Sequence, residues 1–264
     1  MGASLLITLR EGLEAALIIS IILAFLSRMD QPKQIRSVWL GAGAAVAASL
    51  AAGAVVFWTA GELSGRAEEL YEGTAMLVAV AVLSYMVMWM RKQARFLKGH
   101  LEAQVESALK TGSTFAMGFL AFVVVIREGI ETVLFLFSAW RVDSDTSALF
   151  LGGLIGLAVA ITIGYLGYKG SRFINLRTFF NVTGVLLIIF AAGLLAHGIH
   201  EFQEAGVFPV IQEEVWNTNG VLNEKAGIGS FVKALFGYNG NPELLEVLFY
   251  FAYLVGVLWT YFRP

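Results

Sequence analysis

The sequence has no cysteine among its 264 residues, and charged residues are scarce. Without cysteine, disulfides, thiolate metal sites and thiol redox chemistry are excluded. Asp, Glu, Lys and Arg make up 14% of the chain, whereas soluble proteins average about 25%. So few charges cannot cover a solvated surface, and a mean hydropathy of +0.73 places the chain in a lipid bilayer. The net charge of −2 gives no reason to expect nucleic acid as a partner.

Long apolar runs predict the fold class, an all-α integral membrane protein. A helix needs about 20 mostly apolar residues to span the hydrocarbon core. Seven segments qualify, and we treat the whole chain, 1–264, as one transmembrane domain. A polar connector at 91–113 and a long outer loop at about 200–243 separate some of them. The seven predicted spans are roughly 3–26, 38–60, 73–90, 114–139, 149–168, 178–199 and 244–262.

Basic residues predict the orientation of these spans. With the N-terminus outside, the predicted inner segments hold most of the 18 Lys and Arg residues. Because cytoplasmic loops are enriched in Lys and Arg, we expect the N-terminus outside and the C-terminus inside. This arrangement needs an odd number of spans, which agrees with seven.

An internal repeat links the two halves of the chain. Residues 5–14 (LLITLREGLE) resemble residues 122–131 (FVVVIREGIE). We therefore predict two inverted three-helix repeats, about 1–113 and about 114–205, with the seventh helix outside the repeat. Transporters built from inverted repeats place the substrate site at the repeat interface.

Each repeat carries an Arg-Glu-x-x-Glu motif inside an apolar helix. Carboxylates three residues apart project from one face of a helix, so two crossing helices would bring four carboxylates to one point. Such an oxygen-only cluster suits hard cations, including iron, manganese and magnesium. We expect the arginines to brace the carboxylates and offset part of their charge. The predicted metal ligands are Glu11, Glu14, Glu128 and Glu131, with Arg10 and Arg127 as the motif arginines.

The alternative is that these motifs are ion pairs with a purely structural role. Arg10 and Glu14 are spaced i,i+4 and could neutralise each other, as could Arg127 and Glu131. Pairing of this kind accounts for only one glutamate in each motif. A central Arg or Asp in a membrane helix costs about 2.5 to 3.5 kcal/mol even on insertion scales. The cost of three ionisable groups in each helix favours the functional interpretation.

A second acidic set falls at the predicted outer ends of the third and sixth spans. Glu69 and Glu72 precede the third span, and His200, Glu201 and Glu204 follow the sixth. We expect an outer entry vestibule that concentrates cations, since clustered charge of one sign raises the local counter-ion concentration. Acidic loop residues that are simply solvated are the ordinary alternative.

These motifs resemble the oxidase-dependent iron transporter family, the high-affinity iron permeases of fungi and their bacterial EfeU-like relatives. The resemblance covers nearly the whole chain. It implies a transporter, not an enzyme, that moves Fe3+ or Fe2+ across the cell (plasma or inner) membrane into the cytoplasm. It is carried by 10–14, 127–131, Glu69-Leu-Tyr-Glu-Gly73, His200-Glu-Phe-Gln-Glu-Ala-Gly206 and Leu235-Phe-Gly-Tyr-Asn-Gly-Asn-Pro242.

The same resemblance implies the partners and leaves alternatives. Iron would be supplied by an extracytoplasmic iron oxidase or a periplasmic iron-handling protein, as cargo and not as a permanently bound cofactor. A homo-oligomer is compatible with this reading. Some relatives are linked to lead, so a permease for manganese or lead is the first alternative, and a membrane scaffold without transport is the second.

Overall fold

The structure is a computed structural model that describes residues 1–62, 64–93, 97–110, 113–142, 146–168, 176–224 and 227–263. Within these ranges all regular secondary structure is helical, as the long apolar runs predict. The helices are α1 (Gly2–Arg28), α2 (Pro32–Glu62), α3 (Arg66–Gln93), α4 (Leu97–Lys110), α5 (Thr114–Val142), α6 (Thr146–Tyr168), α7 (Leu176–Glu204), α8 (Gly227–Phe236) and α9 (Leu244–Phe262).

Five of these helices are long and apolar enough to cross a membrane. They lie in α2, α3, α6, α7 and α9, at Pro32–Ala60, Arg66–Met90, Thr146–Leu166, Phe180–Glu204 and Leu244–Phe262. Helices α1 and α5 have 27 and 29 residues, but each holds the three charges of its motif. The membrane class is therefore confirmed, while seven spans, their orientation and the repeat stay predictions.

The helix ends differ from the predicted spans mainly at the starts of α2 and α3 and at the end of α7. The third span was predicted to begin at 73, whereas α3 begins at Arg66, so Glu69 and Glu72 lie within α3 and do not precede it. The predicted span 178–199 ends before the acidic residues, whereas α7 continues to Glu204. The outer loop expected at about 200–243 therefore begins at residue 205, and it contains α8. The predicted connector 91–113 contains α4.

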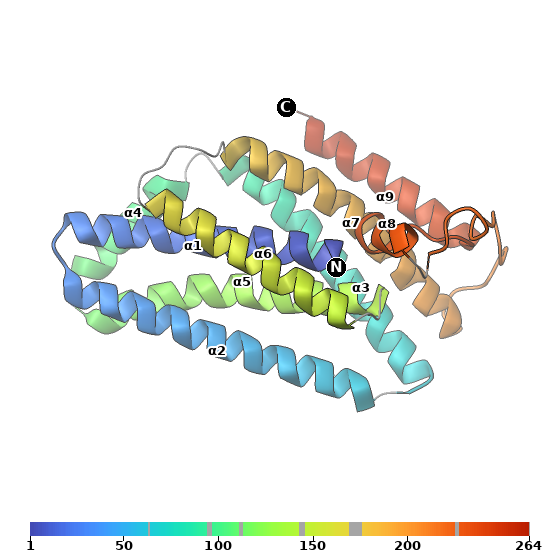
Figure 1. Cartoon of the computed structure of the whole chain (residues 1–264), viewed down its shortest axis with the longest axis horizontal. Helices are drawn as coiled ribbons and strands as arrows, with labels where there is room; N and C mark the ends of the chain where they lie inside the picture. Colours follow the sequence, from blue (N-terminus) through green and yellow to red (C-terminus); the bar gives the residue numbers. More distant parts are fainter. Residues whose placement is uncertain are drawn as a thin grey trace.

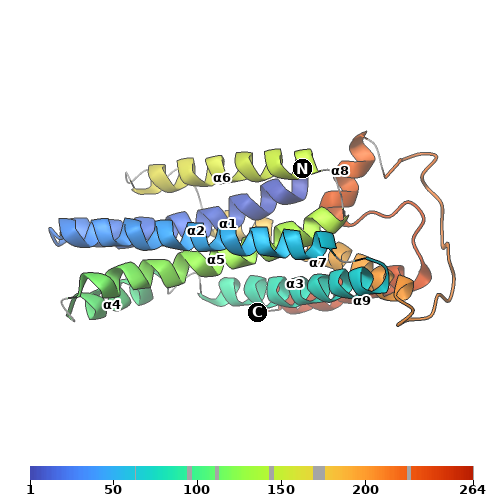
Figure 2. The same ribbon diagram turned by 90° about the horizontal axis from the view of Figure 1, so that it is seen from below.

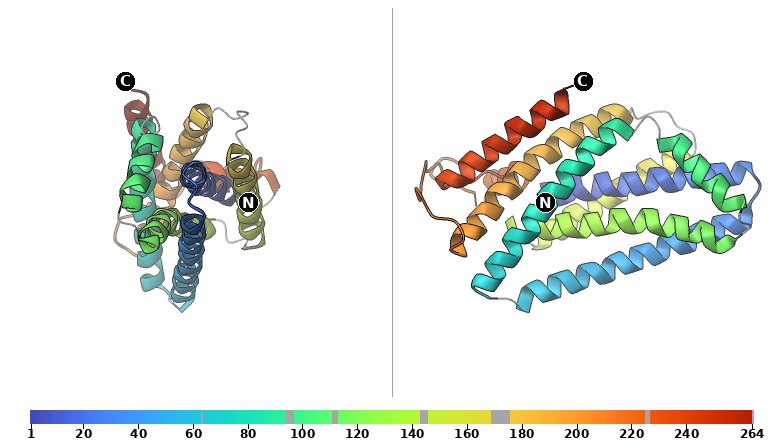
Figure 3. Two further views of the ribbon diagram at one scale, coloured as in Figure 1. Left: turned by 90° about the vertical axis from the view of Figure 1, so that its left-hand side faces the viewer. Right: turned by 180° about the vertical axis from the view of Figure 1, so that it is seen from behind.

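Three helix pairs have the most extensive contacts: α1 with α6, α2 with α5, and α3 with α7. Helices α3, α7 and α9 lie side by side and cross the direction of the other long helices (Figures 1 and 3). The loop that holds α8 lies at one end of the molecule and α4 at the other (Figure 2). The N-terminus lies beside α8.

Glycines allow the close approach in two of these pairs. A methyl group added at Gly129 of α5 would overlap the side chain of Ser49 on α2. One added at Gly12 of α1 would lie 3.0 Å from Cβ of Ala160 on α6. Both glycines belong to the Arg-Glu-x-x-Glu motifs, so each motif is also the place where its helix packs closely against a neighbour.

The apolar core has two parts, and the motifs lie between them along both helices. Ala3–Ile7 of α1 and Phe135–Val142 of α5 contribute to a cluster with α3, α7 and α9. Ile18–Leu26 of α1 and Met117–Val125 of α5 contribute to a second cluster with α2 and α4. The motif residues of α1 and α5 therefore occupy the interval between two apolar layers.

Candidate functional site

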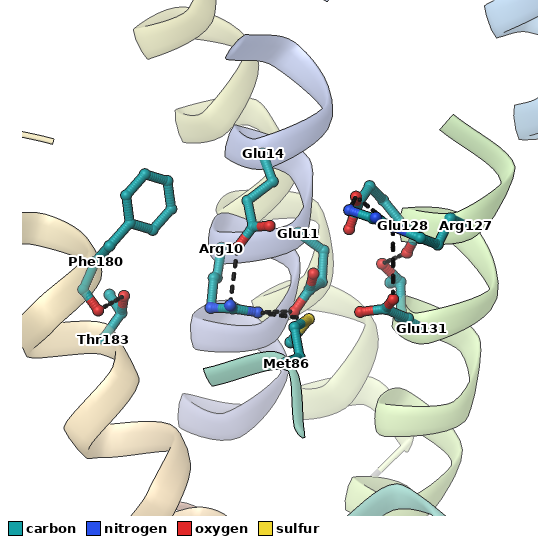
Figure 4. Close-up of polar contacts among 10 residues, drawn as sticks. Arg10, Glu11, Glu14, Met86, Arg127, Glu128, Glu131, Phe180 and Thr183 are labelled. Carbon is teal, nitrogen blue, oxygen red and sulfur yellow. Dashed lines mark hydrogen bonds and ion pairs between the residues drawn. The ribbon is translucent and has the colours of Figure 1, made fainter. Parts of the chain in front are cut away.

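The α1 motif is fully buried and internally paired. Arg10 Nη1 donates to Glu11 Oε1 at 2.7 Å, and Arg10 Nη2 lies 2.9 Å from Glu14 Oε1. Nη1 also donates to the sulfur of Met86 on α3 at 3.2 Å. Figure 4 shows Arg10 between the two glutamates. The expectation that pairing accounts for only one glutamate is wrong here, because the two amino groups of one guanidinium reach different carboxylates.

The α5 motif has the same pairing but a different exposure. Arg127 Nη2 lies 2.5 Å from Glu128 Oε1, and Arg127 Nε lies 3.8 Å from Glu131 Oε1. The Arg127 side chain is 49% exposed, whereas that of Arg10 is 2% exposed. Its guanidinium carbon lies 5.5 Å from the ring centre of Trp89 on α3. The two motifs are therefore alike in sequence but unlike in their surroundings.

Three of the four predicted ligands come together between α1 and α5. Glu11, Glu128 and Glu131 each offer a carboxylate oxygen, and these oxygens lie within 4.8 Å of one another. Figure 4 shows Glu11 facing the other two across the gap between the helices. Glu14 is not part of this group, although it pairs with the same Arg10 and its Oε1 is also buried without a hydrogen-bond partner among the described residues.

The three carboxylates keep oxygens free for a ligand. Oε2 of Glu11, of Glu128 and of Glu131 is buried and has no hydrogen-bond partner among the described residues. A buried carboxylate oxygen without a donor is unfavourable, since each such group retains its desolvation penalty. A hard cation bound between the helices would give these three carboxylates a partner that the described residues do not supply.

The predicted outer entry set is divided among different partners. Glu72 is buried and forms an ion pair with Arg141 of α5, which also lies 2.9 Å from Glu68. Glu201 lies 3.5 Å from His197 on its own helix. Sequence reasoning missed the role of Arg141, although a basic residue in the last turn of α5 was a visible signal.

The remaining residues of this set have other surroundings. Glu69 is half-buried, and Glu204 is exposed with Oε1 at 3.4 Å from His200 Nε2. Neither belongs to a group of three or more potential metal ligands among the described residues. A common vestibule of these side chains stays a prediction.

A second group of potential metal ligands includes residues that sequence reasoning did not single out. His200 at the end of α7 meets Glu243 and Glu246 at the start of α9, with ligand atoms within 4.8 Å of one another. Nδ1 of His200 lies 3.6 Å from Glu243 Oε1 and 3.4 Å from Glu246 Oε1. The i,i+3 spacing of these glutamates, directly after Pro242, was the signal that could have identified them.

Comparison with known proteins identifies similar sequences over the full length. A family model described as the iron permease FTR1 family matches residues 1–261. The chain is 38% identical to the ferrous iron permease EfeU of Yersinia pestis, over all of this chain and 94% of that protein. It is also 38% identical to the protein of the same name from Escherichia coli O6:H1, over all of this chain and 96% of that protein. No solved structure matches the chain.

Proposed function

The chain belongs to the iron permease FTR1 family, and from this membership we propose that iron crosses the membrane through the carboxylate cluster between α1 and α5. The chain is a multi-pass membrane protein whose family and relatives transport iron. The observation that carries the proposal is the meeting of Glu11, Glu128 and Glu131, each with a buried oxygen that lacks a partner. Iron is the cargo, and transport requires no resident cofactor.

Helices α1 and α5 complete seven spans in this proposal. Their charges are partly neutralised, because each arginine pairs with the carboxylates of its own motif. The packing of the helices supports the inverted repeat. In the repeat, α1 corresponds to α5 and α2 corresponds to α6. The contact between α1 and α6 therefore has an equivalent in the contact between α5 and α2, and both contacts are extensive. An interface between two such repeats is where transporters bind their substrates.

The direction of iron transport and the side from which iron is supplied follow from the proposed orientation of the chain in the membrane. With the N-terminus outside, the loop end of the molecule faces the exterior, and iron moves from there to the cytoplasm. An extracytoplasmic iron oxidase or a periplasmic iron-handling protein would deliver it there, and a homo-oligomer is compatible with this route. The relatives named ferrous iron permeases favour Fe2+ as the cargo, while three carboxylates could also hold Fe3+.

Uptake of radiolabelled iron into proteoliposomes tests the proposed function. We expect Glu128→Gln to lower the uptake rate by at least about tenfold. Loss of a group that only positions a metal ligand already lowers metal affinity or activity by about 10- to 100-fold, and Glu128 is proposed as a ligand itself. The exposed Glu214→Gln is the matched control and should transport normally. Normal uptake by Glu128→Gln would contradict the proposed route. Supplying iron as Fe2+ with reductant, or as chelated Fe3+, separates the two oxidation states.

Metal-dependent thermal stability separates a permease from the two alternatives. An ion that binds only the folded state raises the melting temperature. We expect Fe2+ to raise it for the detergent-solubilised chain, and to raise it less for Glu128→Gln. An unchanged melting temperature with iron, manganese and lead would favour a scaffold. A rise with manganese or lead but not with iron would favour a permease for that metal.

A further inference from the structure

We propose a second metal site, for a divalent transition-metal ion, formed by His200, Glu243 and Glu246 at the end of the molecule that carries the long loop. His200 lies in the last turn of α7, Glu243 caps the start of α9, and Glu246 lies in the first turn of α9. Helices α7 and α9 pack side by side (Figure 3). We call this group the loop-end site.

The distances in the loop-end site are compatible with a metal ion bound between the imidazole and the carboxylates. Nδ1 of His200 lies 3.4 and 3.6 Å from the two carboxylate oxygens. Charge-assisted N–H···O bonds are usually about 2.7 to 2.9 Å long. Two ligand atoms that each lie about 2.1 Å from a tetrahedral ion are about 3.4 Å apart. Both nitrogen–oxygen distances therefore match the separation of two ligand atoms on one such ion, and the oxygens of the two carboxylates lie within 4.8 Å of each other.

Two atoms of the loop-end site are buried without a hydrogen-bond partner among the described residues. They are Nδ1 of His200 and Oε2 of Glu243. All three side chains line one cavity of about 250 Å3. A cavity of this size holds an ion together with water molecules that complete its coordination.

The protein already orients the ligands. Glu246 is buried, its Oε2 accepts a hydrogen bond from Asn239 Nδ2 at 2.9 Å, and its Oε1 accepts one from the backbone N–H of Glu243 at 3.2 Å. Glu243 in turn caps α9 through its side chain. Partners of this kind hold metal ligands in place at most metal sites.

Lys233 does not neutralise the carboxylates of the loop-end site. Lys233 lines the same cavity, but it pairs with Glu224 at 3.5 Å. Glu224 also accepts a hydrogen bond from the backbone N–H of Gly240 at 2.8 Å. The positive charge of Lys233 is therefore directed to a carboxylate outside the loop-end site, and the three ligands keep room for a cation.

The imidazole distinguishes the loop-end site from the cluster between α1 and α5. Ca2+ and Mg2+ take oxygen ligands, whereas imidazole suits iron and zinc. A site with one imidazole and two carboxylates thus selects a transition metal before the ion meets an oxygen-only cluster. This selecting role rests on the proposed function, but the binding of metal to the loop-end site does not.

Equilibrium dialysis of Fe2+ under anaerobic conditions tests the proposal on the full chain in detergent. A Glu11→Gln, Glu128→Gln background removes the cluster between α1 and α5, so that binding reports on the loop-end site. We expect this background to bind one Fe2+ per chain. Adding His200→Gln should weaken binding at least about tenfold, and adding Glu214→Gln should leave it unchanged. Excess Mg2+ or Ca2+ should not displace the iron.

Three outcomes would overturn the proposal. They are no Fe2+ bound by the background, equal binding after His200→Gln, and displacement by Mg2+, which would indicate an ordinary acidic surface. If His200→Gln does not fold, Glu243→Gln replaces it, because the amide oxygen can still cap α9. Failed iron uptake by the wild-type chain would count against the proposed function alone, since the dialysis needs no transport.

Discussion

At the scale of single residues, the two motif arginines have equal sequence context and unequal surroundings. Arg10 is buried, contacts two carboxylates and donates to Met86. Arg127 is half-exposed and lies over Trp89. A guanidinium can brace two oxygens with fixed geometry, and an ammonium cannot. The bracing role therefore belongs more strongly to Arg10.

We expect Arg10→Lys to reduce iron uptake more than Arg127→Lys, although both keep the charge. Lysine at position 10 replaces the planar guanidinium with an ammonium that cannot span the two buried carboxylates in the same fixed geometry. A buried carboxylate that loses its partner destabilises by about 1 to 3 kcal/mol or more. Proteoliposome uptake and melting temperature measure the two effects. Arg28→Lys, on the exposed end of α1, is the control. Equal and normal uptake by both motif variants would make the arginines simple counter-charges.

At the scale of helices, an ion-pair cluster connects α5 to α3 at the loop end. Arg141 of α5 pairs with Glu68 and with the buried Glu72, both in the first turns of α3. Contacts between α3 and α5 are otherwise much fewer than those of α3 with α7. The cluster therefore contributes strongly to the position of α3 relative to the helix that carries the second motif.

We predict that Arg141→Gln destabilises the protein by about 3 kcal/mol, because it leaves the buried Glu72 without its partner. Thermal unfolding in detergent measures the change. The double variant with Glu72→Gln should recover part of the stability, since the uncompensated charge is gone. Glu68→Gln, which removes the more exposed partner, should have a smaller effect. A double variant less stable than Arg141→Gln would contradict this account.

At the scale of the whole molecule, local patterns predicted more than distant contacts. Apolar runs located the long helices, and 244–262 matches α9. The i,i+3 spacing placed Glu128 and Glu131 on one face, and the repeat paired them with Glu11. These predictions needed only helix geometry and chain symmetry.

The parts that sequence reasoning missed depend on contacts between distant segments. His200 meets Glu246 across a loop that begins at residue 205 and includes α8. Nothing in the local pattern of either residue shows that the end of α7 lies beside the start of α9. The group of three carboxylates leaves out Glu14, and Arg10, which pairs with Glu14, also donates to Met86 of α3, a contact between residues 76 positions apart.

The orientation of the chain in the membrane can be tested by labelling single introduced cysteines. Because the sequence has no cysteine, one introduced thiol is the only site for a maleimide. Gly220 lies in the long loop and Gly99 in α4, at opposite ends of the molecule (Figure 2). An added Cβ at either glycine has no neighbour within 4 Å, so cysteine fits at both positions.

We expect a membrane-impermeant maleimide to label Gly220→Cys in intact cells and to label Gly99→Cys only after the membrane is permeabilised. The excess of basic residues in the predicted inner segments predicts that α4 lies on the cytoplasmic side. Equal labelling of both variants in permeabilised cells is the control for thiol reactivity. The reverse pattern would place the loop-end site on the cytoplasmic side. Iron taken up by the cell would then reach His200 after it leaves the cluster between α1 and α5, and not before it enters that cluster.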